Sequence, residues 1–432
     1  MKIQENLDKI SWSIADKVVF IIFGFVSLIQ MKSLGPSDYG LYTILINLHT
    51  WLFIISDSFA LQNIVQFGMD KENRLKVNTI SLITHICVSL GIALIIYILQ
   101  IPFSNIFNEP KLESVASFLP ILCLLFIPRT YCIKIIYREH KMLSLFFVNL
   151  AFMGTMSILT FYFLAFKSHL DFSDMKVIYI SGAILSSLTA IITTFNELKF
   201  GFKGNIRLKT LISYSIPFTL TSSLHSAITR LDSLIILKFF SIEVVGIYSA
   251  AKTLFRFFEE TINAAQGLVY PAAVRQFTKN DSKALNDLMT KSVSFLLFTM
   301  IIIVIILEFG ISDLFISWFL PIKYAKATGL FNLLILSSLA LPLVLLTSII
   351  LASGKPYVVF VSVIISICLS LITFYYININ GDTALIPLGL MMYSFSLGII
   401  SLIYCNKNLG FKYNQLYRII NDSKYYFRKY IN

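Results

Sequence analysis

Residues 77–101 read VNTISLITHICVSLGIALIIYILQI, a stretch without a single Lys, Arg, Asp or Glu. Because about 20 apolar residues cross the hydrocarbon core of a bilayer, this stretch predicts a transmembrane helix. Hydrophobic residues make up 57% of the 432 residues and charged residues only 13%, against about 25% charged residues in soluble domains. Similar runs predict an all-α polytopic membrane protein with twelve transmembrane helices. The predicted spans are 11–31, 40–66, 77–101, 115–135, 143–165, 177–197, 210–238, 245–275, 290–312, 327–352, 356–379 and 383–406.

The Lys and Arg residues of the termini, the loops and the ends of the spans fall unevenly on the two predicted sides of the membrane. The N-terminus, every second loop and the C-terminal tail hold 23 of them, Lys134 included. The opposite loops hold seven: Lys32, Lys111, Lys167, Lys176, Lys238, Lys323 and Lys326. Since cytoplasmic loops are enriched in Lys and Arg, both termini are predicted to be cytoplasmic. The net charge of +12 reflects this asymmetry, so nucleic acid is not an expected partner.

An internal duplication relates the two halves of the chain. Residues 34–42 read LGPSDYGLY and residues 240–248 read FSIEVVGIY, which places Gly40 and Gly246 206 residues apart. Six spans in each half give both halves the same orientation, so the repeats are predicted to be parallel. We therefore expect two pseudo-repeated six-helix lobes around a central cavity, at 1–204 and 205–408. A basic aromatic tail at 409–432 is predicted to lie on the anionic inner leaflet or in solvent.

These segments resemble the polysaccharide-transport branch of the MOP superfamily, which also includes the MATE exporters and the lipid II flippases. Leu34–Tyr42, and the stretch from Arg230-Leu231-Asp232 through Gly246-Ile247-Tyr248-Ser249-Ala250-Ala251, are similar to the corresponding turns of Wzx-type flippases for O-antigen and capsule repeat units. The resemblance implies alternating access in a bacterial inner membrane, with an undecaprenyl-diphosphate-linked oligosaccharide as substrate. It also implies a polysaccharide polymerase and a chain-length regulator as protein partners.

Charged residues within the spans are candidates for function, because they are costly in a bilayer unless they face a cavity or a partner. In span 245–275, five polar residues are spaced by 4, 3, 4 and 3, which places them on one helical face. They are Lys252, Arg256, Glu259, Asn263 and Gln266. Five cations at different predicted depths form a ladder suited to a diphosphate headgroup. From the cytoplasmic side these are Lys17 and Arg129, then Arg256, then Lys252 and Arg230.

Acidic residues in the spans allow two interpretations. Asp16, Asp57, Glu259 and Glu260 are candidates for coupling transport to protons or Na⁺. Together with Asp232 they equal the five cations in number, so internal ion pairs are the alternative, such as Asp57 or Glu259 with Lys17 or Arg256. For Arg129, which follows Pro128, a structural role is an equal alternative. The five cysteines have no CxxC spacing, and no metal site or bound cofactor is expected.

Several enzyme classes lack support in the sequence. There is no GxxxxGK[ST] phosphate loop, HExxH motif or GxSxG elbow, and the predicted outer loops are short. A membrane transporter is therefore predicted rather than an enzyme. A MATE-like, ion-coupled exporter of small organic cations is the alternative within the fold. A membrane polysaccharide polymerase, which would place its catalytic residues in a long outer loop, is the less favoured alternative outside it.

Overall fold

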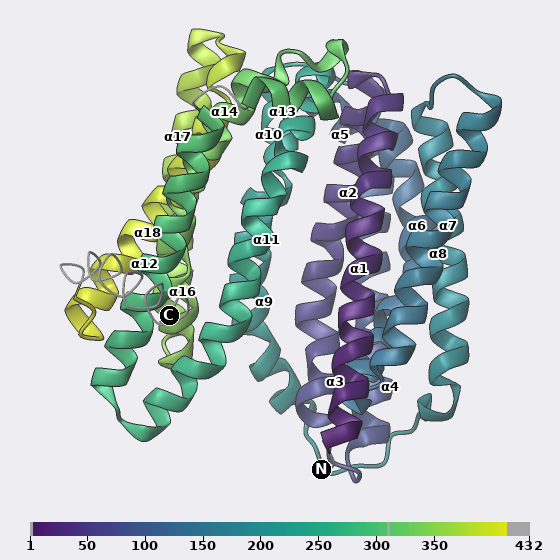
Figure 1. Ribbon diagram of the computed structural model, residues 1–432. Helices are drawn as coiled ribbons and strands as arrows, with labels where there is room; N and C mark the ends of the chain where they lie inside the picture. The colour runs from purple at the N-terminus through teal and green to yellow at the C-terminus, as the bar shows by residue number, and fades with distance from the viewer. Residues whose placement is uncertain (1–2, 309–311, 413–432) are drawn as a thin grey trace. The chain divides into compact units, whose positions relative to one another are not determined.

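A computed structural model describes residues 3–308 and 312–412, and within them every regular element is a helix (Figure 1). The helices of the first half are α1 (Ile3–Ser33), α2 (Pro36–Ser56), the π-helix η1 (Asp57–Leu61), α3 (Gln62–Phe67), α4 (Arg74–Ile98), α5 (Gln100–Phe107), α6 (Leu112–Glu139), α7 (Met142–Phe166), α8 (Phe172–Thr194) and the 3₁₀ turn η2 (Phe195–Glu197). Those of the second half are α9 (Leu208–Arg230), α10 (Asp232–Phe239), α11 (Ile242–Lys279), α12 (Ser282–Ile306), α13 (Ser312–Phe319), η4 (Ile322–Tyr324), α14 (Ala327–Ser337), α15 (Leu341–Val344), α16 (Leu346–Ala352), α17 (Pro356–Asn380), η5 (Thr383–Leu385) and α18 (Pro387–Asn408).

Among the described residues, each of the twelve predicted spans overlaps a helix or a series of consecutive helices. Among the described residues, nine helices are long and apolar enough to cross a membrane, and a tenth span results if α14 and the bent segment after it count as one. That bend is 44°. The helices α9 and α11 are long enough but too polar to qualify by composition. The chain is thus an all-α multi-pass membrane protein, and the number twelve stays a prediction.

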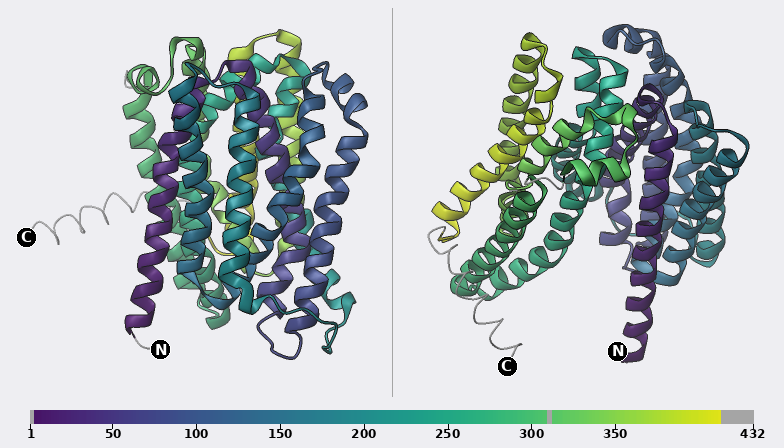
Figure 2. Two further views of the ribbon diagram at one scale, coloured as in Figure 1. Left: turned by 90° about the vertical axis from the view of Figure 1, so that its right-hand side faces the viewer. Right: turned by 45° about the horizontal axis from the view of Figure 1, so that its top comes forward.

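The first of two compact units comprises residues 1–246. In it α7 packs between α1 and α8, α6 packs against α4 and α8, and α9 lies along α2. The purple-to-blue helices of this unit run alongside one another (Figure 2). Their outer faces expose large apolar side chains, such as Ile98 and Ile192, as expected for contact with lipid. The predicted lobe boundary at 204/205 stays a prediction; in the structure α9 and α10 belong to this first compact unit.

The loops of the first unit gather in two groups. The Lys76 ammonium donates to the Gly204 carbonyl at 3.2 Å, and Lys141 pairs with Glu197 at 2.5 Å. In the other group Leu170 N–H donates to the Ser33 carbonyl, and further hydrogen bonds join Lys176 to Ser114 and Lys238 to Ile106. The first group contains only predicted inner loops and adjoining helix ends, and the second only predicted outer ones. Loops predicted on the same side thus contact one another in the first unit, while the cytoplasmic assignment stays a prediction.

The second unit comprises residues 247–432. Here α18 packs against α14, α15, α16 and α17, and α12 packs against α15. Pro342 and Pro387, which fall inside predicted spans, lie in the first turns of α15 and α18. Proline is favoured there because the first helical N–H groups have no partner within the helix. Most of the predicted tail, residues 413–432, lies outside the described residues.

Candidate functional site

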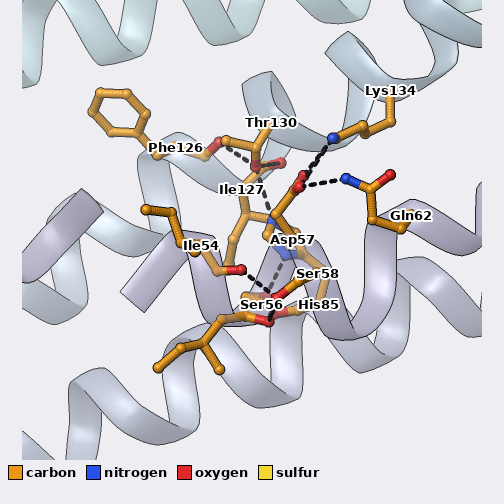
Figure 3. A network of polar contacts seen from close by, with 11 residues as sticks. Ile54, Ser56, Asp57, Ser58, Gln62, His85, Phe126, Ile127, Thr130 and Lys134 are labelled. Carbon is orange, nitrogen blue, oxygen red and sulfur yellow. Dashed lines mark hydrogen bonds and ion pairs between the residues drawn. The ribbon is translucent and has the colours of Figure 1, made fainter. Parts of the chain in front are cut away.

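The Asp57 carboxylate lies at the start of the π-helix η1, where it is held by two side chains (Figure 3). Lys134 Nζ of α6 lies 2.9 Å from Asp57 Oδ1, and Gln62 Nε2 donates to Oδ2 at 3.1 Å. Lys134, counted above among the loop cations, lies instead within α6, where its side chain is 17% exposed. The partner of Asp57 is thus Lys134, and not Lys17 or Arg256 as the sequence suggested.

A fully buried histidine, His85 of α4, cross-links α2 and α6 beside this ion pair (Figure 3). Ser56 Oγ lies 2.5 Å from Nδ1 of His85, and Thr130 Oγ1 lies 2.8 Å from Nε2. The Thr130 hydroxyl donates its single proton to the carbonyl groups of Phe126 and Ile127. We therefore assign Nε2 as the donor to Thr130 and Nδ1 as the acceptor from Ser56. In this arrangement both ring nitrogens of the neutral imidazole are occupied.

A second buried network joins α1, α6 and α7 through Asn149. Arg129 donates to Asn149 Oδ1 at 2.8 Å, and Asn149 Nδ2 donates to Asp16 Oδ1, also at 2.8 Å. The Arg129 guanidinium also lies 4.9 Å from the Phe152 ring centroid. Asp16 is 5% exposed, so a single neutral amide bridges a buried carboxylate and a guanidinium by one hydrogen bond to each. This arrangement agrees with the structural alternative for Arg129.

The two networks use residues that the charge pattern alone did not single out. Asn149 is the only amide side chain in the predicted span 143–165, and His85 is the only histidine in 77–101. A lone amide or imidazole in an apolar run is costly to bury unless it is hydrogen-bonded. This signal is present in the sequence and could have identified both residues. Lys134, near the edge of the predicted span 115–135, could have been identified in the same way.

The polar residues of α11 contrast with these networks. Lys252 is 8% exposed, with its ammonium 5.8 Å from the Tyr248 ring centroid. Arg256 is half-buried, and among the described residues it makes no ion pair, although Glu259 and Glu260 follow it by three and four positions. The buried stripe of the helix is formed by its neighbours Phe255, Phe258, Ile262, Val269 and Ala273.

The remaining candidate residues are placed as follows. On α11, Glu259 and Gln266 are half-buried, while Glu260 and Asn263 are exposed. Lys17 is exposed on α1, with Nζ 5.4 Å from the Phe20 ring centroid. Arg230 ends α9 and is half-buried. Asp16 and Lys17 are neighbours with opposite environments because successive helical residues are about 100° apart around the axis.

Comparison with known proteins identifies the family and the fold. Residues 33–328 match the protein family described as "Polysaccharide biosynthesis protein". A multidrug resistance MATE family transporter of the MOP superfamily, solved facing inward, is 11% identical, covers 93% of this chain and 94% of its own, and gives a TM-score of 0.73. The lipid II flippase MurJ in an inward closed conformation is 14% identical. The match covers 95% of this chain and 90% of MurJ, with a TM-score of 0.71. A MOP superfamily transporter from Pyrococcus furiosus is 14% identical. The match covers 93% of this chain and 94% of that transporter, with a TM-score of 0.61.

The family match and the structural similarities confirm the resemblance noted from the sequence at the level of family and fold. The fold is similar to that of solved MOP superfamily transporters and flippases. No curated protein matches this chain. At identities of 11–14% the solved structures establish the fold alone.

Proposed function

The chain belongs to the polysaccharide biosynthesis protein family, and from this premise we propose that it is a flippase for a lipid-linked oligosaccharide. The proposed substrate is an undecaprenyl-diphosphate-linked repeat unit of O-antigen or capsule, moved from the inner to the outer leaflet of a bacterial inner membrane. The proposed architecture has twelve spans in two parallel lobes around a central cavity, with both termini cytoplasmic. Alternating access would carry the headgroup across, and a polymerase and a chain-length regulator would act on the exported unit.

The observation that carries this proposal is the environment of Arg256. A charged side chain in the middle of an apolar bundle is expected to have a partner, and Arg with Glu three or four residues away on a helix commonly pairs with it. Arg256 makes neither of these pairs among the described residues. Its guanidinium is therefore available to an external anion. The planar fork of Arg binds two phosphate oxygens together, which suits a diphosphate.

The acidic residues of the first unit favour this substrate over a small organic cation. A cation exporter needs carboxylates that a positively charged substrate can reach. Asp57 is held by Lys134 and Gln62, and Asp16 by Asn149. Each of these carboxylates is therefore already engaged by a donor from the protein. Glu259, on the same face as Arg256, is the carboxylate that we favour for coupling to a proton or Na⁺.

The test replaces Arg256 in a strain whose own flippase is deleted. We expect Arg256→Ala to lower surface glycan at least tenfold and Arg256→Lys to give an intermediate level, because Lys keeps the charge and loses the fork. Arg275→Ala is the matched control, since Arg275 is an exposed cation near the end of the same helix. It should export normally. Immunoblotting of membranes checks that all variants are present at equal amounts.

Two results would contradict the proposal. Normal export by Arg256→Ala would remove Arg256 from the substrate path. Restored export in a double variant that combines Arg256→Ala with Glu259→Gln would show that Arg256 only neutralises that carboxylate. A cation exporter would instead confer resistance to cationic drugs, a phenotype that the same strains can be scored for.

A further inference from the structure

The loop at residues 198–207 joins η2 to α9, and the beginning of α4 holds it in place. Three hydrogen bonds connect the backbone of this loop to polar side chains of α4 and of the residue before it. They join Asn78 Nδ2 to the Lys199 carbonyl at 3.0 Å, the Gly201 N–H to Thr79 Oγ1 at 2.8 Å, and the Ile206 N–H to Asn73 Oδ1 at 2.9 Å. The backbone is therefore fixed by contacts within the first unit, and the side chains of the loop are positioned before any partner binds.

The side chains of the loop carry charge of one sign. Residues 198–209 read LKFGFKGNIRLK, with four cations and no Asp or Glu. The cations are Lys199, Lys203, Arg207 and Lys209, all of them exposed. None of the four makes an ion pair among the described residues. Because like charges this close together repel one another, the segment favours an anionic partner that neutralises them.

Exposed aromatic rings lie among these cations. Phe202 is 70% exposed, and Phe200 remains exposed although its ring stacks on that of Tyr131, with 6.2 Å between the centroids. Large apolar side chains that gather on a surface indicate a contact surface. Basic residues beside Phe are typical of segments at the boundary between hydrocarbon and phospholipid headgroups.

The lipid-facing surface of α8 leads directly to this loop. Four exposed apolar side chains, spaced by 3, 4 and 3, share one face of the helix. They are Leu185, Leu188, Ile192 and Phe195. Phe195, the last of them, has helical backbone angles and ends this face at the η2 turn. The loop therefore begins at the edge of the surface that contacts hydrocarbon, where the phosphate groups of a bilayer are expected.

We propose that loop 198–207, together with Phe195 and Lys209, is a binding surface for the headgroups of anionic phospholipids. The phenylalanine rings enter the boundary of the acyl region, and the cations contact the phosphate groups. An acidic protein would match the charge, but it would leave unexplained why the apolar face of α8 continues to the loop. The inference concerns the membrane around the protein and does not depend on what the protein transports.

The test measures which phospholipids lie beside the loop. A fluorophore is attached to the cysteine of an Asn205→Cys variant, at an exposed position of the loop, after replacement of the five native cysteines. The full chain is reconstituted into phosphatidylcholine nanodiscs that contain a small share of nitroxide-labelled phosphatidylglycerol or, at the same share, nitroxide-labelled phosphatidylcholine. We expect several-fold stronger quenching by the anionic lipid. Equal quenching by the two lipids would overturn the proposal and favour an acidic protein as the partner.

Neutralising the cations of the loop tests their role. The triple variant combines Lys199→Gln, Lys203→Gln and Arg207→Gln. It should lower the preference for the anionic lipid by about fivefold or more, because one cation near an anionic surface contributes roughly that factor. An unchanged preference would overturn the proposal.

The matched control removes three exposed cations from another predicted inner loop and its flanking helix ends. It combines Arg275→Gln, Lys279→Gln and Lys283→Gln. This variant should keep the full preference for the anionic lipid. An equal loss in both triple variants would overturn the proposal, since the preference would then follow the net charge of the whole protein.

Two further measurements distinguish a bilayer surface from a site for soluble anions. Phe202→Ser should lower quenching by both lipids together, because the ring no longer holds the loop in the headgroup region. Excess glycerol phosphate in solution should leave the preference unchanged. Unchanged quenching in Phe202→Ser, or loss of the preference in glycerol phosphate, would overturn the proposal. Melting temperatures equal to that of the unmodified protein check that every variant is folded.

Discussion

Three charged residues in the helices of the first unit and Arg256 in the second have different surroundings. In the first unit Asp16, Asp57 and Arg129 are each held by a neighbouring side chain. In the second unit Arg256 makes no ion pair among the described residues. A charge with a partner contributes to folding, whereas a charge without one is costly to keep and is explained more readily by a ligand. We therefore expect substitutions in the hydrogen-bonded networks of the first unit to lower stability, and substitution of Arg256 to lower transport without lowering stability.

The largest effect on stability is expected at Asn149. Asn149→Leu removes the amide that bridges Arg129 and Asp16, and it leaves a buried carboxylate and a guanidinium each short of a hydrogen bond. We expect a cost of about 3 kcal/mol, because a lost bond to a charged group costs roughly 1.5–3 kcal/mol. Thermal unfolding in detergent, followed by tryptophan fluorescence, measures the loss.

The matched control for this change is Asn263→Leu on α11. Asn263 is exposed and has no hydrogen-bond partner among the described residues, so its replacement should leave the melting temperature unchanged. Equal destabilisation by both substitutions would remove the distinction between the two units.

A smaller effect is expected at Lys134. Lys134→Ala leaves Asp57, whose side chain is 30% exposed, with Gln62 as its remaining partner. We expect a loss of about 2 kcal/mol, below the 3–5 kcal/mol typical of a fully buried pair, since water reaches the carboxylate. The double variant Lys134→Ala with Asp57→Asn should recover most of it. Arg256→Ala measured alongside should melt like the wild type, and a comparable drop there would show that Arg256 is a structural partner.

The smallest effect concerns Lys167, in a predicted outer loop. Asp174 accepts a hydrogen bond from the Lys167 ammonium at 2.6 Å and raises the pKa of this exposed lysine. A raised pKa in the folded state stabilises the protein below the unfolded-state pKa of about 10.4, and this contribution is lost as pH rises through the folded-state pKa. Lys167→Ala should therefore lower the melting temperature slightly at pH 8, and this effect should fade as the pH rises through the raised folded-state pKa. Lys203→Ala, at an exposed lysine without a described partner, should show no such dependence.

The helices were predictable because hydrocarbon imposes a strong and local constraint. A run such as 77–101 needs no information from the rest of the chain to indicate a helix. The breaks and irregular turns within the helices were not predictable in the same way. The π-helix at Asp57–Leu61 adds a residue to one turn, and nothing in the apolar pattern marks it. The short helices α5 and α13 lie outside the predicted spans except for their first residues, since they are too short to cross a bilayer.

Partners of the candidate residues were harder to predict than their positions. Spans were delimited by the gaps between charges, and this rule assigns a cation at a span edge, such as Lys134, to a loop. Asp57 and Lys134 are 77 positions apart in the chain, and only packing of α2 against α6 brings them together. Asn149 carries no charge, so a count of charges could not include it. That the polar residues of α11 share a helical face follows from their spacing within one element, but the role of that face in a cavity stays a prediction.

Gly40 and Gly246 lie 206 residues apart in the repeated segments, and a Cβ atom on either would overlap a carbonyl oxygen of the other segment, at Ile242 and at Pro36. This contact bears on the origin of the chain, because in a half-length ancestor that paired with a second copy the same glycine would have made it from both sides. One glycine codon would then have served both sides of the contact. Gene fusion would have turned that single codon into two, which can mutate independently, yet each must still encode glycine while the other helix backbone lies against it. The two positions are therefore expected to stay glycine together in descendants of the fused gene, even where the flanking tyrosines and leucines have drifted apart.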